Sequence, residues 1–319
     1  AELISRGHEL AYKYTPRLYG VGYRISEMTP QSRMYEQNAK GADELCRVLF
    51  SGSYDVVISV HIFAAMMMTE LRINREINIP SFFVATDYTC SPGVSEIVAD
   101  KYFIPHEKLR EEFVSQGIPA NRIVASGIPV REEFCRRSDK KAARRALGMS
   151  EEGRLLLLCC GSMGCGPIQK ILRDISENLP DDCEVTGVCG NNKRLFRRLS
   201  DEYAAFGNIN IRGYSKNISL LMDSADLYLT KPGGISTTEA AVKGLPMVLV
   251  NAVGGCEAPN LAFFTERGAA ATADTPEGLA ALCIELLSDG VRLTEMSNAA
   301  KALGIGNSAA ALYEKIHSN

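Results

Sequence analysis

The sequence predicts an α/β fold with two β/α/β domains, and three observations lead to this prediction. The chain has 319 residues, an ordinary length for two domains. Continuous apolar runs, YDVVISV at 54–60 and RLLLLCC at 154–160, are typical of parallel strands that are buried on both faces. A polar residue or a glycine-rich turn follows each run, at the place where open α/β sheets bind ligands.

Composition limits the classes of function. An apolar fraction of 46% can fill two cores, and the formal net charge of −3 argues against nucleic acid as a partner. The 10 cysteines contain no C-x-x-C pair, so buried reduced thiols are expected rather than a zinc site. No apolar run reaches the roughly 18 residues of a membrane span, so we expect any membrane contact to be peripheral.

The N-terminal segment at 1–28 alternates aromatic and basic residues, and Pro16 argues against one straight helix. Two explanations stay open. The segment lies on an anionic membrane surface, or its tyrosines pack on their own domain. The residues concerned are Tyr12, Lys13, Tyr14, Arg17, Tyr19, Tyr23 and Arg24.

Two polar residues end the first predicted strands. After a helix at 31–50, the strand at 54–60 ends at His61, and after a methionine-rich helix at 63–74, the strand SFFVAT ends at Asp87. Both side chains therefore converge on one crevice as a general base or an acceptor-binding group. The alternatives are a buried, satisfied imidazole for His61 and a turn or N-cap role for Asp87.

The chain then passes to the second domain. The strand DKYFI, the helix HEKLREEFVSQ and the strand NRIVAS complete the first domain near residue 134. The basic run at 136–149 predicts a short linker helix, which has either a solvated face or a lipid contact. The strand at 154–160 leads into a glycine turn at 161–166, which lacks the Lys-Ser/Thr ending of a P-loop and the spacing of a dinucleotide fingerprint.

Further along, the strand EVTGVCG ends at Asn191 and Asn192. A dinucleotide oxidoreductase needs an acidic residue there for the adenosine ribose, so the asparagines argue against that class. The strand INIR and the turn GYSKNI precede a helix at 217–224, and the chain ends in helices.

The stretch at 226–260 carries the strongest signal. Gly233 and Gly234 allow positive φ and close approach to a ligand, and Ser236 is expected as the N-cap of the next helix. The exposed N–H groups of that helix would stabilise a diphosphate without a metal. Glu239 has two explanations: a capping box with Ser236, or acceptance of hydrogen bonds from both hydroxyls of a ribose.

Several collinear motifs resemble a known family: TKPGGISTTEAAVKGLPMVLV, GGCEAPNLAFFTERGAA, CCGSMGCGP, VCGNNKRL, TDYT and SGIPVREEF. They are similar to the monogalactosyldiacylglycerol synthases and processive diacylglycerol glucosyltransferases. The chain departs from that family's pattern in three places. The family's first strand and glycine- and histidine-rich loop have no counterpart here, TDYT is not followed by His and Trp, and Cys256 replaces a Gln.

The resemblance implies a GT-B fold, with two Rossmann-like β/α/β domains facing each other across a cleft. It implies an acceptor and membrane-side domain at 1–135, a donor domain at 150–303 and a final helix at 304–319 that returns to the first domain. Catalytic roles are expected for His61 and Asp87. The expected donor-site residues are Gly161, Ser162, Met163, Gly164, Gly190, Asn191, Tyr214, Ile218, Lys231, Gly233, Gly234, Ile235, Ser236, Glu239, Glu257 and Asn260.

By the same resemblance, we expect an inverting transfer of a hexose from UDP-galactose or UDP-glucose to diacylglycerol. No metal and no cofactor are expected, and the expected place is the cytoplasmic face of an anionic membrane. Two alternatives are a UDP-sugar epimerase of the same fold and a non-catalytic UDP-sugar-binding protein.

Overall fold

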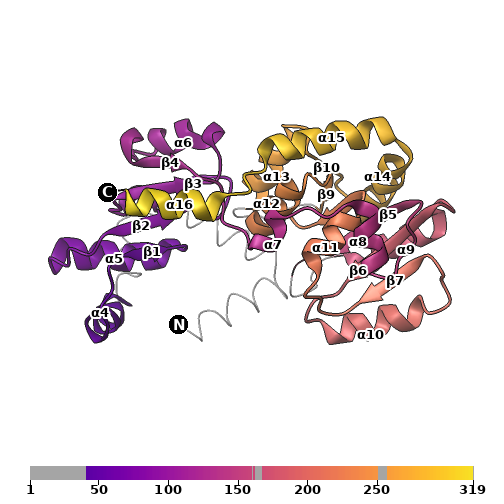
Figure 1. Ribbon diagram of the computed structural model, residues 1–319, viewed down its shortest axis with the longest axis horizontal. Helices are drawn as coiled ribbons and strands as arrows, with labels where there is room; N and C mark the ends of the chain where they lie inside the picture. The colour runs from indigo at the N-terminus through magenta and orange to yellow at the C-terminus, as the bar shows by residue number, and fades with distance from the viewer. Residues whose placement is uncertain (1–40, 160, 162–166, 251–256, 319) are drawn as a thin grey trace. The chain divides into compact units, whose positions relative to one another are not determined.

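The computed structural model describes residues 41–159, 161, 167–250 and 257–318. These residues form two compact units, whose elements are labelled in Figure 1. Unit 1 comprises residues 41–129, 257–259 and 307–318, and unit 2 comprises residues 130–250 and 260–306 apart from the gaps just given. The predicted tyrosine-rich segment at 1–28 lies outside the described residues.

Unit 1 is built on a 4-stranded parallel sheet in the order β1-β2-β3-β4. Its strands are β1 (Val57–Ser59), β2 (Ser81–Val84), β3 (Lys101–Ile104) and β4 (Ile123–Ala125). Its helices are α4 (Ala42–Ser51), α5 (Ile62–Asn74), α6 (Arg110–Ser115) and α16 (Ser308–His317), with short 3-10 turns at Val94–Glu96, Glu107–Leu109 and Ala120–Arg122.

Strand β1 differs from its prediction. The run at 54–60 is shorter as a strand, and Ile58 at its centre is 44% exposed, so two-sided burial is wrong here. Among the described strands β1 lies at the edge of the sheet and pairs only with β2, so its side chains are covered less than those of a central strand. Strand β2, with neighbours on both sides, is buried along its whole length.

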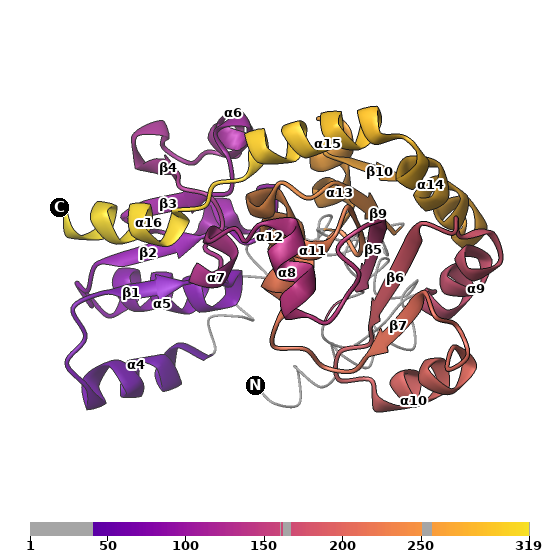
Figure 2. The same ribbon diagram turned by 45° about the vertical axis from the view of Figure 1, so that its right-hand side comes forward.

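The last helix belongs to unit 1. Leu312 and Ile316 of α16 pack against Phe82, Val84 and Phe103 of β2 and β3. Figure 2 shows α16 running alongside these two strands. The chain thus leaves unit 1 near residue 130 and returns to it near residue 307. Within the residues that the structure describes, no helix has both the length and the apolar character needed to cross a membrane.

Unit 2 is built on a 6-stranded parallel sheet in the order β10-β9-β8-β5-β6-β7. The strands are β5 (Arg154–Cys159), β6 (Cys183–Val188), β7 (Ile209–Arg212), β8 (Leu227–Thr230), β9 (Met247–Leu249) and β10 (Ala270–Thr272). The helices are α7 (Glu132–Cys135), α8 (Lys140–Ala146), α9 (Ile168–Asn178), α10 (Lys193–Glu202), α11 (Ile218–Ser224), α12 (Gly234–Lys243), α14 (Pro276–Ser288), α15 (Gly290–Leu303) and, from Asn260 on, α13 (Glu257–Thr265). Together the two parallel sheets confirm the predicted α/β class.

The core of unit 2 lies between its sheet and the flanking helices. Leu156 and Leu158 of β5 pack with Ile171 and Leu172 of α9 and with Leu286 of α14, all fully buried. This burial explains why β5 reads as an uninterrupted apolar run. Three buried cysteines are free thiols, as expected: Cys159 in β5, Cys183 in β6 and Cys189 directly after β6.

The basic linker run forms α8, but its face is not simply solvated. Arg144 is only 2% exposed and pairs with Asp226 at 2.7 Å, where Asp226 also accepts a hydrogen bond from the Leu155 N–H. A buried charge requires such a partner, so this arginine anchors α8 to the start of β5 and β8. By contrast, Arg145 is exposed and pairs with Glu151.

Candidate functional site

Three neighbouring strands of unit 2 end in register. Cys159 of β5 is paired with Thr230 of β8 on one side and with Val188 of β6 on the other. The chain order of the strands reverses between β5 and β8, so this is the topological switch point at which open α/β sheets bind ligands. A hydrogen bond from Thr230 Oγ1 to the Cys159 carbonyl, 2.7 Å long, fixes the two strand ends to each other.

The turn after β8 leads directly into α12. The Gly233 N–H donates to the Lys231 carbonyl at 2.8 Å, and Gly233 is the N-cap of the helix. The first intrahelical bond comes from the Thr237 N–H. The N–H groups of residues 234–236 therefore have no acceptor inside the helix, and they lie at the positive end of its dipole. That end is suited to an anionic group such as a diphosphate.

The predicted capping role of Ser236 is wrong. Ser236 is the third residue of α12, and its hydroxyl donates to the Gly233 carbonyl at 3.2 Å. No side chain caps this helix, because Gly233 already occupies the N-cap position. Gly233 has a φ of −80°, so it does not use the positive φ that glycine allows. Without Ser236 at the N-cap, the capping-box explanation of Glu239 is also wrong.

Glu239 lies one turn further along α12 with its carboxyl largely removed from water. Burial raises its pKa to about 7; the guanidinium of Arg131 opposes this rise and the carboxylate of Glu133 adds to it. Among the described residues, no group donates a hydrogen bond to this carboxylate. A desolvated carboxyl group without donors, beside a switch-point turn, is typical of a ligand-binding group.

Positive φ occurs instead in the turns after β5 and β6. Gly161 has a φ of 75° and Gly190 a φ of 57°, a region that side-chain-bearing residues rarely adopt. A Cβ atom at Gly161 would lie 3.7 Å from Cε of Lys231, so the turns after β5 and β8 come together. The predicted residues Ser162, Met163 and Gly164 lie outside the described residues.

The predicted donor-site residues that follow β6 and β7 fall at the same edge or next to it. Asn191 is exposed after β6, while its neighbour Asn192 caps α10 by accepting from the Leu195 N–H at 3.0 Å. Tyr214 follows β7 and is 63% exposed, and Ile218 is the first residue of α11. Because Val188 of β6 pairs with Arg212 of β7, the turn carrying Tyr214 emerges at the same edge of the sheet.

Asn260 contacts the backbone of the turn after β8. Its side chain is fully buried, and Nδ2 donates to the Pro232 carbonyl at 3.0 Å. Asn260 thereby holds the turn between Lys231 and Gly233, so it shapes the turn from behind. Glu257 is the first residue of α13.

In unit 1, His61 and Asp87 both lie beyond the carboxyl ends of neighbouring strands, β1 and β2. His61 is the N-cap of α5, where its Nδ1 accepts from the Phe63 N–H at 3.3 Å. The loop that carries Asp87 is held by Glu112 of α6, whose Oε1 accepts from Thr89 Oγ1 and the Cys90 N–H, each at 2.7 Å. The described residues contain no group of three or more His, Cys, Asp or Glu side chains arranged to hold a metal ion.

Three residues that shape these sites carry no recognisable signal in the sequence. Glu112 is 23 residues away from Thr89 on a separate helix, and nothing in its local pattern marks it. The charges of Arg131 and Glu133 act on the Glu239 carboxyl, although the motif SGIPVREEF, which contains both residues, does not indicate this role. Only the folded structure brings Glu112 near the loop after β2, and Arg131 and Glu133 near Glu239.

Comparison with known proteins gives consistent results. Residues 2–130 match the monogalactosyldiacylglycerol (MGDG) synthase family, and residues 155–310 match the glycosyltransferase family 28 C-terminal domain. The chain is 29% identical over 293 residues to a processive diacylglycerol beta-glucosyltransferase of Staphylococcus saprophyticus, covering 92% of this chain and 74% of that protein. A protein of the same description from Bacillus licheniformis is 31% identical over 265 residues, covering 82% and 68%.

Solved structures show the same fold at lower identity. MurG from Acinetobacter baumannii has a TM-score of 0.66 at 19% identity, covering 88% of this chain and 78% of that chain. UDP-GlcNAc 2-epimerase from Neisseria meningitidis has a TM-score of 0.67 at 14% identity, covering 91% and 83%. These likenesses confirm the predicted GT-B fold. The sequence relatives and the family match show that the chain belongs to the family of the monogalactosyldiacylglycerol synthases and processive diacylglycerol beta-glucosyltransferases.

Proposed function

We propose that this chain transfers a hexose from a UDP-sugar to diacylglycerol, with inversion, to make a glycolipid. UDP-glucose is the first candidate donor because the relatives from both organisms are named beta-glucosyltransferases. UDP-galactose is the second, because the first domain matches the MGDG synthase family. An acceptor that resides in the bilayer requires the enzyme to act at a membrane surface, so we place it peripherally on the cytoplasmic face.

One observation carries the donor side of this proposal: the Glu239 carboxyl and the open amides of residues 234–236 lie on the same helix at the switch point. The two oxygens of a carboxylate suit the two adjacent hydroxyls of a ribose. The amides at the start of α12 suit the diphosphate to which that ribose is attached. The carboxyl group and the amides are about one helical turn apart, and a nucleoside diphosphate has a ribose and a diphosphate to contact both. A free sugar lacks the diphosphate.

The same amides have a role in the chemical step. When the glycosidic bond breaks, negative charge develops on the β-phosphate of UDP. Fixed N–H dipoles facing that position stabilise the charge without having to reorganise. The ammonium group of Lys231 in the preceding turn is the side chain we assign to the same phosphates, since it combines a positive charge with three donors.

We assign the general base to Asp87, with His61 as the second candidate. Direct attack by the acceptor hydroxyl on the anomeric carbon breaks the bond to UDP and forms a β-linkage from an α-linked donor. The hydroxyl proton must pass to a base within hydrogen-bond reach. The Asp87 loop suits this role because Glu112 fixes it with two hydrogen bonds.

The test is turnover of UDP-glucose and, separately, UDP-galactose with diacylglycerol in mixed vesicles, with the lipid product identified by mass spectrometry. We expect glycolipid and one UDP per sugar transferred. Asp87→Asn should abolish turnover while UDP still binds, whereas Glu239→Ala should weaken UDP binding about tenfold or more. Arg292→Ala, an exposed residue on α15, serves as the control and should change neither.

The two alternatives give different outcomes in the same assay. An epimerase would interconvert UDP-sugars with no diacylglycerol present and would form no glycolipid. A non-catalytic binding protein would bind UDP and release none from UDP-sugars under any condition. Either outcome, obtained with the full-length gene product, would contradict the transferase proposal.

A further inference from the structure

Unit 2 has a cavity at the edge of its sheet opposite to the donor turns. Arg154 is the first residue of β5, Asp226 directly precedes β8 and Pro246 directly precedes β9, and all three line this cavity. It has a volume of about 490 Å³, within the range of small-molecule sites. At about 3.3 Å per residue, the length of β5 separates it from the donor turns by roughly 17 Å, so one small ligand cannot occupy both.

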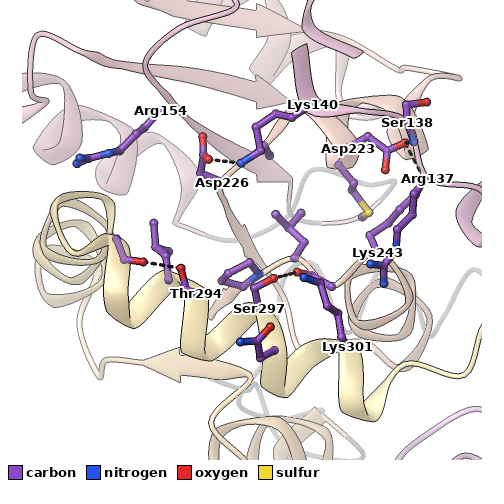
Figure 3. A pocket seen from close by; sticks show the side chains of 18 residues that line it. Arg137, Ser138, Lys140, Arg154, Asp223, Asp226, Lys243, Thr294, Ser297 and Lys301 are labelled. Carbon is purple, nitrogen blue, oxygen red and sulfur yellow. Dashed lines mark hydrogen bonds and ion pairs between the residues drawn. The ribbon is translucent and has the colours of Figure 1, made fainter. Parts of the chain in front are cut away.

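The cavity is lined by more positive than negative charge. Figure 3 shows its side chains, with Arg154 at one end and Arg137 at the other. The lining cations are Arg137, Lys140, Arg154, Lys243 and Lys301, and the lining carboxylates are Asp223 and Asp226.

Both carboxylates are already paired. Asp223 accepts from Lys243 Nζ at 2.8 Å, in a pair whose side chains are 1% and 6% exposed. Asp226 accepts from Lys140 and from Arg144, which lies buried behind it. The two carboxylates are thus paired with three cations, Lys243, Lys140 and Arg144. Neither lining carboxylate is left to neutralise the other cations of the cavity.

Those remaining cations are Arg137, Arg154 and Lys301. Arg137 donates to the Val242 carbonyl at 2.7 Å and Arg154 to the Leu287 carbonyl, and a carbonyl carries no formal charge. Across the described part of the chain, the ammonium of Lys301 has neither a hydrogen bond nor an ion pair.

The Lys301 side chain is nevertheless held in place along its stem. Its aliphatic carbons lie against the backbone of Gly244, where a Cβ atom would overlap them. Gly244 has a φ of 66° and ends α12, so glycine is required there on two counts. The hydroxyl of Ser297, one turn earlier on α15, donates to the Gly244 carbonyl at 2.7 Å and fixes the same contact.

We propose that this cavity binds a phosphate-bearing anion. Guanidinium groups donate in pairs to phosphate oxygens and ammonium groups supply compact positive charge, and the cavity offers both. Ser138, Thr294 and Asn298 add neutral polar groups to its lining. The anion would reach the cavity either as a free phosphate compound or as the headgroup of a phospholipid. This proposal does not depend on the donor-site assignment.

The experiment has one arm for each source. In the first, inorganic pyrophosphate is titrated calorimetrically into the full chain, with and without saturating UDP. In the second, the chain is sedimented with phosphatidylglycerol vesicles and with phosphatidylcholine vesicles. Lys301→Ala and Lys301→Glu are the test variants because the Lys301 ammonium has no hydrogen bond or ion pair among the described residues. Arg292→Ala on the same helix is the matched control.

We expect a saturable site that is present with or without UDP. Lys301→Ala should weaken it about fivefold and Lys301→Glu further, with Arg292→Ala unchanged. Pyrophosphate binding with this pattern identifies a soluble anion, and phosphatidylglycerol binding with this pattern identifies a headgroup. If neither probe binds, or if both bind equally well to the Lys301 variants, the proposal is wrong and the cations form only a solvated surface.

Discussion

The Glu239 carboxyl has a pKa raised by burial to about 7, so its charge changes within the physiological pH range. If the ionised form accepts hydrogen bonds from the ribose, UDP must bind that form and release a proton below pH 7. We therefore predict that UDP affinity falls about tenfold per pH unit below the pKa and is constant above it. Calorimetric titrations between about pH 5.5 and pH 8.5 measure this.

Glu239→Gln should bind UDP with little pH dependence over the same range, since an amide does not titrate. Without ligand, the wild-type carboxyl contributes stability that is fully present below its unfolded pKa of 4.5 and is lost as pH rises through about 7. The melting temperature of Glu239→Gln should therefore exceed that of the wild type most at high pH. An identical pH profile of UDP affinity in both proteins would contradict this role for Glu239.

Two glycines in neighbouring turns should respond differently to the same substitution. Gly161 has a φ of 75°, whereas Gly233 has a φ of −80° and room for a Cβ, whose nearest neighbour would be Ser236 Oγ at 3.5 Å. Gly161→Ala should lower the free energy of unfolding by about 1–2 kcal/mol, and Gly233→Ala by about 0.5 kcal/mol or less. Denaturant unfolding measures both, and equal losses would show that the backbone conformation is not the cause.

At the scale of elements, one buried ion pair joins three helices of unit 2. Lys243 at the end of α12 pairs with Asp223 of α11 and also donates to the carbonyls of Glu133 and Arg136 beside α7. Lys243→Met would leave a buried carboxylate without a partner, at a cost of about 3–5 kcal/mol in the free energy of unfolding.

The matched control for Lys243 is Arg145→Ala, which removes an exposed pair and should cost about 1 kcal/mol or less. The double variant Lys243→Met, Asp223→Leu should recover part of the loss, because it removes the unpaired charge. A double variant no more stable than Lys243→Met would assign the cost to the lost carbonyl contacts instead.

The loop after β2 depends on Glu112. Its Oε1 accepts both hydrogen bonds from Thr89 and Cys90, so Glu112→Ala should misplace Asp87 and lower kcat about tenfold to a hundredfold while UDP affinity stays the same. Glu112→Gln keeps an oxygen acceptor at the same position and should retain most of the activity. If Glu112→Gln is as slow as Glu112→Ala, the charge itself rather than the hydrogen bonds is required.

Among the strands, the sequence predicts best those whose two faces are both buried. The run at 154–160 predicted β5 correctly, because a strand with neighbours and helices on both sides needs apolar residues throughout. The similar run at 54–60 also predicts a strand buried on both faces, and this is wrong because Ile58 of β1 is exposed. The pattern Ser-x-x-Glu wrongly predicts Ser236 as a cap because it is only local, whereas the turn through Pro232 moves the helix start to Gly234.

For the molecule as a whole, the strand order could be anticipated only through the resemblance to a family. The switch point between β5 and β8 follows from that order, and it brings Gly161 and Lys231 together across 70 residues of chain. Contacts made by single long-range side chains were not predictable. The pairing of Arg144 with Asp226 and the hold of Asn260 on the Pro232 carbonyl both join residues that no local pattern relates.

The central claim is that UDP binds at the switch point of unit 2, and a crystal structure of the chain with UDP tests it most directly. The account predicts the diphosphate on the amides of residues 234–236 and both ribose hydroxyls on the Glu239 carboxylate. UDP bound at another place, or a ribose that does not contact Glu239, would contradict it.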